Sequence, residues 1–216
     1  MRRLTAAGLL AWLAALAGCG SSDPTYPPPS QETLNQVAGR FHDRDSNRPL
    51  PDQGSGEVPL KYLDLRGKEV DLASFRGRAH VVLVVVKGMP RFPGGAFCPG
   101  CLAQVNALTA NHPEFQKREA EILMVFPGSK DKLPQFFKDA RVDGQEGNPG
   151  VPFPLLVDED LRAVRALGIV GDLAKPSTYI LDKQGNAVFA FVGEGTTDRP
   201  SVSALLARLD KLNAKR

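Results

Sequence analysis

The chain has 216 residues, of which 42% are hydrophobic and 24% charged, and its formal net charge is +3. This length suits one compact domain with appended segments, and the composition is that of an ordinary globular protein. The Lys and Arg residues are scattered rather than gathered into a basic stripe, so we expect no nucleic-acid partner.

The first 18 residues have two arginines, Arg2 and Arg3, directly after Met1 and then an apolar run from Ala6 to Ala17. That run is shorter than the about 20 apolar residues that cross a bilayer as a helix, and it has the length of a signal-peptide core. It ends in "LAGC", residues 16–19, which resembles the lipobox of bacterial lipoproteins. The resemblance implies a signal peptide over residues 1–18 and a lipid on Cys19. It also implies a place in the cell envelope, anchored to a membrane and facing the periplasm or the exterior. Ordinary secretion is the alternative.

The segment after Cys19 is rich in Ser and Pro, a composition that buries little surface. We therefore expect residues 19–56 to be the lipidated cysteine and an extended tether, in which "ETLNQVAGRF" has the residues of a short helix. Residues 57–216 are expected to form the folded domain.

From Val58 onward the hydrophobic pattern becomes regular. Alternating residues predict a small hairpin, and "HVVLVVVKG" is a β-branched run typical of a strand buried on both faces. Further patterns predict helices after Cys101 and over residues 131–140, 160–169 and 202–212, strands over residues 121–128 and 153–160, and a hairpin over residues 177–195. This alternation predicts an α/β fold with a central mixed β-sheet, helices on both faces and an N-terminal hairpin extension.

Two cysteines in "PGGAFCPGC", Cys98 and Cys101, are the thiols left if Cys19 carries a lipid. Pro99 favours a helix start, so Cys98 is expected at a helix N-terminus. Unpaired N–H groups there lower a thiol pKa by up to about one unit, and a hydrogen bond from the second thiol adds to this effect. Cys98 is therefore the expected nucleophile. Cys101, one turn inside the helix, is placed to resolve a mixed disulfide.

A zinc site and a static crosslink are the competing interpretations of this pair. Zinc needs about four protein ligands, or three and water, yet the chain has no second cysteine pair, and its histidines, His42, His80 and His112, have no ligand spacing. A crosslink across two residues closes a tiny loop and gains little stability. Redox chemistry is favoured, with no metal and no cofactor expected.

The region from about Val58 to Leu212 resembles the thioredoxin superfamily. Within it, the region is similar to the redoxin and peroxiredoxin-like branch of alkyl hydroperoxide reductases and thiol-specific antioxidants. The similar stretches are the strand before the motif, "CPGC", "PFPLLVDED", "LRAVRALGI" and "KPSTYILDKQGNAVFAFVG". The resemblance implies a thioredoxin-like fold. It also implies an enzyme of antioxidant or redox-homeostasis function, either a thiol–disulfide oxidoreductase or a thiol-dependent peroxidase.

The match to peroxiredoxins departs from their pattern at two positions. In "GAFCPGC", Cys98 stands where the family has Thr, and Cys101 takes the position of the peroxide-attacking cysteine. Pro176 stands where the family has an Arg, so the resemblance implies that both peroxide-activating groups are absent. Pro176 instead resembles the cis-proline of thioredoxins, which implies that it docks the substrate chain; starting an edge strand is its alternative role. Ser177 and Phe97, which replaces a common Trp, are expected to bind substrate beside it.

Three functional hypotheses follow. The first is a membrane-tethered thiol–disulfide oxidoreductase in which Cys98 attacks, Cys101 resolves, and the partners are protein disulfides or thiols and a reducing protein. The second is a thiol peroxidase in which a hydroperoxide oxidises Cys101 to a sulfenic acid and Cys98 resolves it. The third is a copper-binding assembly chaperone, since thiolates suit Cu(I). The similar copper chaperones use a distal His, and no His follows His112 here.

Overall fold

The structure, a computed structural model, describes residues 27–48, 58, 61–88, 97–143 and 150–215. Within these residues one mixed sheet is formed by β1 (Lys61–Asp64), β2 (Glu69–Asp71), β3 (His80–Val85), β4 (Ala120–Pro127), β5 (Leu155–Asp158), β6 (Ser177–Leu181) and β7 (Ala187–Val192). The strands lie in the order β2-β1-β5-β4-β3-β6-β7. The β1–β2 hairpin pairs antiparallel with β5, so the predicted hairpin extension is confirmed.

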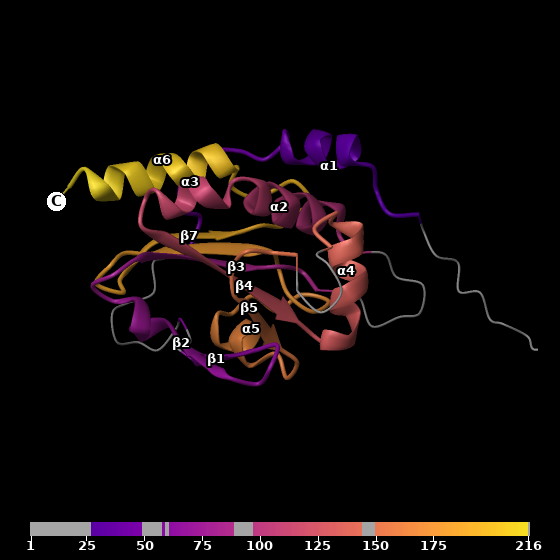
Figure 1. The fold of residues 1–216 in the computed structure, drawn as a ribbon, viewed down its shortest axis with the longest axis horizontal. Coiled ribbons are helices and arrows are strands. Elements are labelled where there is room, and N and C mark those ends of the chain that lie inside the picture. The colour runs from indigo at the N-terminus through magenta and orange to yellow at the C-terminus, as the bar shows by residue number, and fades with distance from the viewer. Residues whose placement is uncertain (1–26, 49–57, 59–60, 89–96, 144–149, 216) are drawn as a thin grey trace, which may run out of the picture.

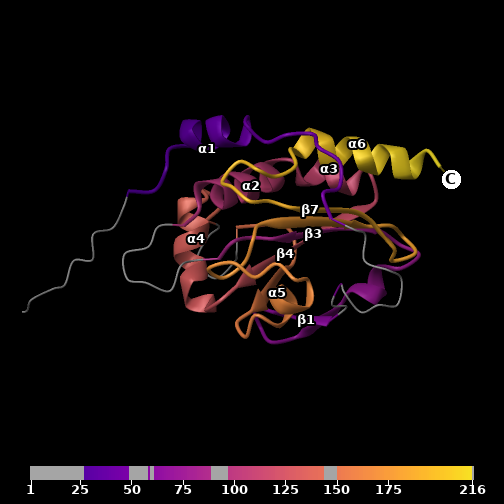
Figure 2. The ribbon, with the colours of Figure 1, turned by 180° about the vertical axis from the view of Figure 1, so that it is seen from behind.

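The described helices are α1 (Gln31–Ala38), α2 (Pro99–Ala110), α3 (His112–Gln116), α4 (Leu133–Asp139), α5 (Arg162–Ala166) and α6 (Val202–Asn213). As Figures 1 and 2 show, α2, α3 and α6 cover one face of the sheet, and α5 lies against the other. The predicted mixed sheet with helices on both faces is confirmed.

The interior strand β3 contributes side chains to both halves of the core. It pairs parallel with β4 and antiparallel with β6, and every residue in it is buried. Because side chains alternate along a strand, Val82 and Val84 join the core under α2, whereas Leu83 and Val85 join the core under α5. The expectation of a strand buried on both faces is therefore confirmed.

The expected tether over residues 19–56 is wrong for its C-terminal part. Leu34 of α1 is 1% exposed and belongs to the core that contains α2. Ser30 caps α1 by accepting a hydrogen bond from the backbone N–H of Thr33. Beyond α1, the N-terminal arm (residues 39–48) lies along β7, where the Asn47 side chain exchanges two hydrogen bonds with the backbone of Val192. The folded domain thus begins about 25 residues earlier than predicted, because one buried leucine in a polar segment gives little periodic signal.

The predicted signal peptide over residues 1–18 and Cys19 lie outside the described residues. Of the helices that the structure does describe, none is long and apolar enough to cross a membrane.

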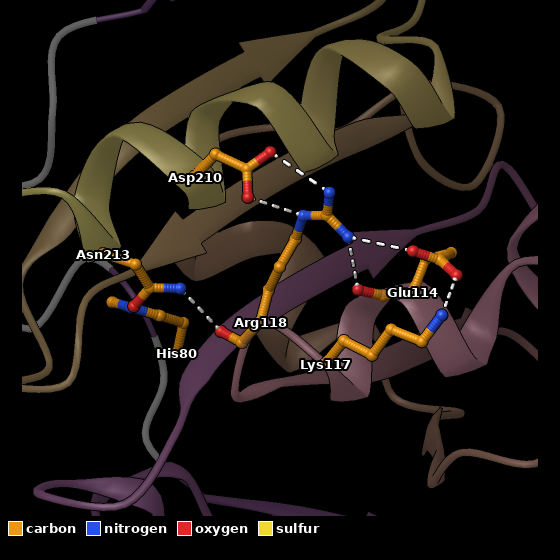
Figure 3. Close-up of polar contacts among 6 residues, drawn as sticks. All are labelled: His80, Glu114, Lys117, Arg118, Asp210 and Asn213. Atoms are coloured by element: carbon orange, nitrogen blue, oxygen red, sulfur yellow. Dashed lines mark hydrogen bonds and ion pairs between the residues drawn. The ribbon is translucent and has the colours of Figure 1, made fainter.

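A polar cluster fixes the C-terminal half of α6 to the rest of the domain (Figure 3). Arg118, just after α3, donates to both carboxylate oxygens of Asp210, at 2.8 and 3.1 Å, and to Glu114. Asn213 donates to the backbone carbonyl of Arg118 and contacts the ring of His80. This cluster holds α6 in place, and the loop that precedes α6 (residues 193–200) contacts the cysteine pair described next.

Candidate active site

Cys98 and Cys101 lie at the first turn of α2. Cys98 is the N-cap residue, and Pro99 occupies the first helical position. The Cys98 carbonyl accepts hydrogen bonds from the backbone N–H groups of Cys101 and Leu102, at 2.9 and 3.1 Å. Both cysteines are free thiols in this structure; Cys98 is half-buried and Cys101 is 1% exposed. The predicted placement of Cys98 at a helix N-terminus is confirmed.

The two thiols have opposite pKa shifts. A hydrogen bond from the Cys101 thiol lowers the pKa of Cys98 to about 5, against the opposing effect of burial; the positive charge of Arg199 and the N–H groups of Cys101 and Gly100 also lower it. The same hydrogen bond, together with burial, raises the pKa of Cys101. At neutral pH, Cys98 is therefore a thiolate and Cys101 a thiol. The backbone N–H of Lys87 also donates to the Cys101 sulfur, at 3.2 Å.

Arg199 is a site residue that sequence reasoning missed. It comes from the arginine loop (residues 193–200), which joins β7 to α6, and its side chain is only 1% exposed. Its Nη1 lies 3.6 Å from the Cys101 sulfur and its Nη2 lies 3.8 Å from the Cys98 sulfur. Nη1 also donates to Gln104 Oε1 at 3.0 Å. A guanidinium thus contacts both sulfurs.

This geometry adds an arginine to the cysteine pair that the sequence did not predict. Pro176 does occupy the position where the peroxiredoxin arginine is expected, but Arg199 reaches the sulfurs from the loop that follows β7. No local pattern distinguishes "TTDRPSV" from a surface turn before a helix. Tertiary packing is what turns this arginine inward.

The N-terminal arm holds the arginine loop in place. The backbone of His42 pairs with the loop through His42 N–H to the Arg199 carbonyl at 3.1 Å and Ser201 N–H to the His42 carbonyl at 2.9 Å. The His42 ring contacts the Asp198 carboxylate at 2.8 Å, and the ring centroid of Phe41 lies 5.6 Å from the Arg199 guanidinium carbon. Asp198 also accepts from the backbone N–H of Glu194. Arg199 is therefore positioned by residues outside the predicted 57–216 domain.

Gly100, between the two cysteines, lets the loop approach closely. A Cβ atom at Gly100 would lie 1.7 Å from the Thr196 carbonyl oxygen and 3.0 Å from the guanidinium carbon of Arg199. Any side chain at this position would collide with loop backbone. The small residue in "CPGC" is thus a packing requirement of the arginine loop.

The expected cis-proline at position 176 is wrong, because none of the described residues has a cis peptide bond. Pro176 is buried, and it precedes β6, which lies between β3 and β7, so the alternative of an edge strand is also wrong. The backbone around it is already paired: Lys175 N–H donates to Ile169, Ser177 Oγ donates to the Lys175 carbonyl at 2.9 Å, and the Pro176 carbonyl accepts from Gly193 at 2.8 Å. Substrate docking at Pro176 stays a prediction, without a free backbone edge to support it.

Phe97 and Ser177, the other expected substrate contacts, lie inside the fold. Phe97 is 4% exposed and packs edge-on against Phe136, with ring centroids 5.1 Å apart, and against Phe126. Ser177 is 3% exposed and lies on β6 opposite Val85. Their substrate-binding roles also stay predictions. Across the described ranges, no group of three or more His, Cys, Asp or Glu side chains is arranged to hold a metal ion.

Comparison with known proteins identifies the family. Residues 55–190 match the AhpC/TSA family. The chain is 28% identical over 137 residues to the chloroplastic peroxiredoxin Q of Sedum lineare, covering 62% of this chain and 64% of that protein. It is 24% identical over 136 residues to the thiol-disulfide oxidoreductase ResA of Bacillus thuringiensis, covering 63% of this chain and 67% of that protein. The chain thus spans less than two thirds of the Sedum protein.

Solved structures agree on the fold. Peroxiredoxin Q of Xanthomonas campestris superposes with a TM-score of 0.53 at 23% identity, covering 79% of this chain and 98% of that chain. The predicted thioredoxin-like fold is therefore confirmed. Of the two named relatives, one is a peroxiredoxin and the other a thiol-disulfide oxidoreductase. Since the family match covers most of the described domain and includes both cysteines, the chain belongs to the AhpC/TSA family.

Proposed function

We propose that this protein is an extracytoplasmic, membrane-tethered thiol–disulfide oxidoreductase that works through Cys98 and Cys101. The observation that carries the proposal is the asymmetry of the pair. Cys98 is half-buried with a pKa of about 5, whereas Cys101 is buried and its pKa is raised. Because the thiolate is the nucleophile in disulfide exchange, Cys98 attacks first at neutral pH.

The exchange proceeds in two steps. The Cys98 thiolate attacks one sulfur of a substrate disulfide; that S–S bond breaks, and the departing substrate thiolate takes a proton from water. Cys101 then loses its proton and attacks the Cys98 sulfur, which expels the second substrate thiolate and forms the Cys98–Cys101 disulfide. The substrate gains two electrons and the pair loses two. The Lys87 N–H and the Arg199 guanidinium, 3.2 and 3.6 Å from the Cys101 sulfur, stabilise its thiolate as it forms. A reducing partner returns the pair to thiols, and every step is reversible.

The tether is part of the same proposal. The lipobox-like end of the apolar N-terminal segment supports a lipid on Cys19 and a location on a membrane of the cell envelope, facing the periplasm or the exterior. In that compartment disulfides persist, which suits disulfide exchange. Cys19→Ser should move the protein from the membrane fraction to the soluble fraction, and unchanged membrane recovery would refute the anchor.

The enzymatic proposal is tested with single-cysteine variants and a protein disulfide substrate. Cys98→Ser should abolish reduction of the substrate by a dithiol donor. Cys101→Ser should instead accumulate a mixed disulfide between Cys98 and the substrate, identified by mass spectrometry. Cys19→Ser, with the pair intact, is the matched control and should keep full activity. Full activity in Cys98→Ser would refute the proposal.

A peroxidase is the second candidate, favoured by the family match and by the arginine beside Cys101, the residue at the peroxide-attacking position. Its difficulty is that Cys101 is 1% exposed and its pKa is raised, so it is a protonated, covered thiol. Rapid-mixing kinetics with hydroperoxides decide between the two. Oxidation faster than that of a free thiol, with a sulfenic acid on Cys101, would favour the peroxidase, and slower oxidation would reject it.

A further inference from the structure

Arg199 is a buried cation without a carboxylate partner in the described part of the chain. Its polar contacts there are Gln104, which is neutral, and the two sulfurs, and its Nε has no partner. Arg118 and Arg208, by contrast, each pair with carboxylates. Since a buried charge is costly unless it is paired, the negative charge that balances Arg199 among the described residues is that of the cysteine pair.

The cysteine pair supplies that charge in only one of its two redox states. In the dithiol state Cys98 is a thiolate 3.8 Å from Nη2, so the guanidinium has a counter-ion. In the disulfide state both sulfurs are neutral, and the guanidinium loses its counter-ion. The disulfide state therefore carries an electrostatic penalty that the reduced state does not.

Contacts to the arginine loop keep the Arg199 guanidinium from moving away from the sulfurs when the disulfide forms. The arginine loop is held by Gly193 N–H to the Pro176 carbonyl, by the pairing of His42 with the Arg199 backbone, and by the His42–Asp198 contact at 2.8 Å. The loop is also tightly closed on itself, since a Cβ atom at Gly193 would lie 2.0 Å from the Asp198 carbonyl oxygen. The guanidinium is thus kept beside the sulfurs when the disulfide forms.

We propose that Arg199 sets the direction of disulfide exchange: as the counter-ion of the Cys98 thiolate it favours the reduced pair, so that the oxidised protein donates its disulfide to substrate proteins with two thiols. In this direction the substrate loses two electrons and two protons and gains a disulfide. The Cys98–Cys101 bond breaks; one proton stays on Cys101 and the other goes to water, because Cys98 remains a thiolate. A partner disulfide of higher potential reoxidises the pair. Stabilising the reduced form is what makes a dithiol pair a strong oxidant.

The inference rests on the proposed function, because it assumes that Cys98 and Cys101 interconvert between dithiol and disulfide. The full chain is equilibrated with mixtures of reduced and oxidised glutathione, free thiols are trapped, and the peptide with the pair is quantified by mass spectrometry. Arg199→Met removes the charge and Arg199→Lys keeps it. Arg208→Met is the matched control, because Arg208 is also a largely buried arginine bound to the N-terminal arm but is not a sulfur contact.

For Arg199→Met we expect the equilibrium constant to shift at least tenfold toward the disulfide, which corresponds to about 30 mV. Arg199→Lys should shift it less, and Arg208→Met should leave it within about twofold. Arg199→Met within twofold of the wild type would overturn the inference while leaving the proposed function intact. If the Cys98–Cys101 disulfide forms in no glutathione mixture, the proposed function itself fails.

Thermal unfolding tests the inference even if Arg199→Met folds poorly, because it does not use that variant. In the wild type, the reduced protein should melt above the oxidised protein, because only the reduced state pairs Arg199. Asp198→Asn keeps the guanidinium but weakens the contact that holds its loop, so the gap should narrow. An oxidised wild type that melts above the reduced form, or an unchanged gap in Asp198→Asn, would overturn the inference.

Discussion

Gly100→Ala tests whether the arginine loop controls the nucleophile. The added Cβ would lie 1.7 Å from the Thr196 carbonyl oxygen, so the loop must withdraw by about 1.7 Å to reach ordinary contact. If Arg199 moves with it, its 3.8 Å separation from the Cys98 sulfur becomes about 5.5 Å. With an effective dielectric constant of about 20, the attraction falls by about 1.4 kcal/mol, which raises the pKa of Cys98 by about one unit. We expect a value near 6 in place of about 5.

The assay is a pH titration of the thiolate by its ultraviolet absorbance, with thermal unfolding alongside. Ala is better than Gly in a helix by about 1 kcal/mol, so without the collision the substitution would stabilise α2. We expect destabilisation instead. Gly195→Ala is the matched control, since a Cβ there meets only the Asp198 Cβ at 4.0 Å. A Gly100→Ala protein that melts above the wild type and keeps its Cys98 pKa near 5 would refute the reasoning.

Three further predictions concern pH, the N-terminal helix and the aromatic cluster. The folded pKa of Cys98 is about 5 and its ordinary value is 9.0, so the reduced protein should lose stability as pH falls from 8 toward 5, by about 1 kcal/mol per pH unit. The oxidised protein lacks this contribution. The same dependence of the free energy of unfolding on pH in the reduced and oxidised forms would contradict the prediction. Leu34→Ala should lower the free energy of unfolding, measured by chemical denaturation, by about 2–5 kcal/mol, whereas Gln36→Ala, at an exposed position, should change it by less than about 0.5 kcal/mol. Equal effects of the two substitutions would support the original prediction that this segment is a tether. Phe97→Ala should lower the free energy of unfolding by about 3–5 kcal/mol, whereas Phe97→Leu should fold and keep an unchanged KM for protein disulfides. A raised KM at unchanged Tm in Phe97→Leu would instead indicate that Phe97 contacts the substrate.

The layers of the fold could be predicted from the sequence, because hydrophobic periodicity reports burial directly. The run at β3 and the apolar stripe of α6 are long and regular, and both form where the pattern places them. The same holds for Cys98, whose position follows from a local rule about Pro99 and helix starts. These features depend on residues close together in the chain.

The features that could not be predicted depend on contacts between distant segments. Arg199 and His42 lie far apart in sequence, and nothing in either neighbourhood indicates that they pair beside the cysteines. The cis state of Pro176 was inferred from resemblance alone, and the structure has a trans bond with its neighbours already hydrogen-bonded. A polar residue's burial is decided by what packs over it, which periodicity does not report.

The residues of the candidate active site lie partly inside and partly outside the segment that matches the AhpC/TSA family. Both cysteines lie within residues 55–190, whereas Arg199 and the arm residues Phe41 and His42 that hold it lie outside that range. Changes confined to the flanking segments would therefore alter the chemistry of an unchanged "CPGC" motif. Two relatives with the same motif and the same family match would need to be compared at these flanks before the redox behaviour of one was assigned to the other.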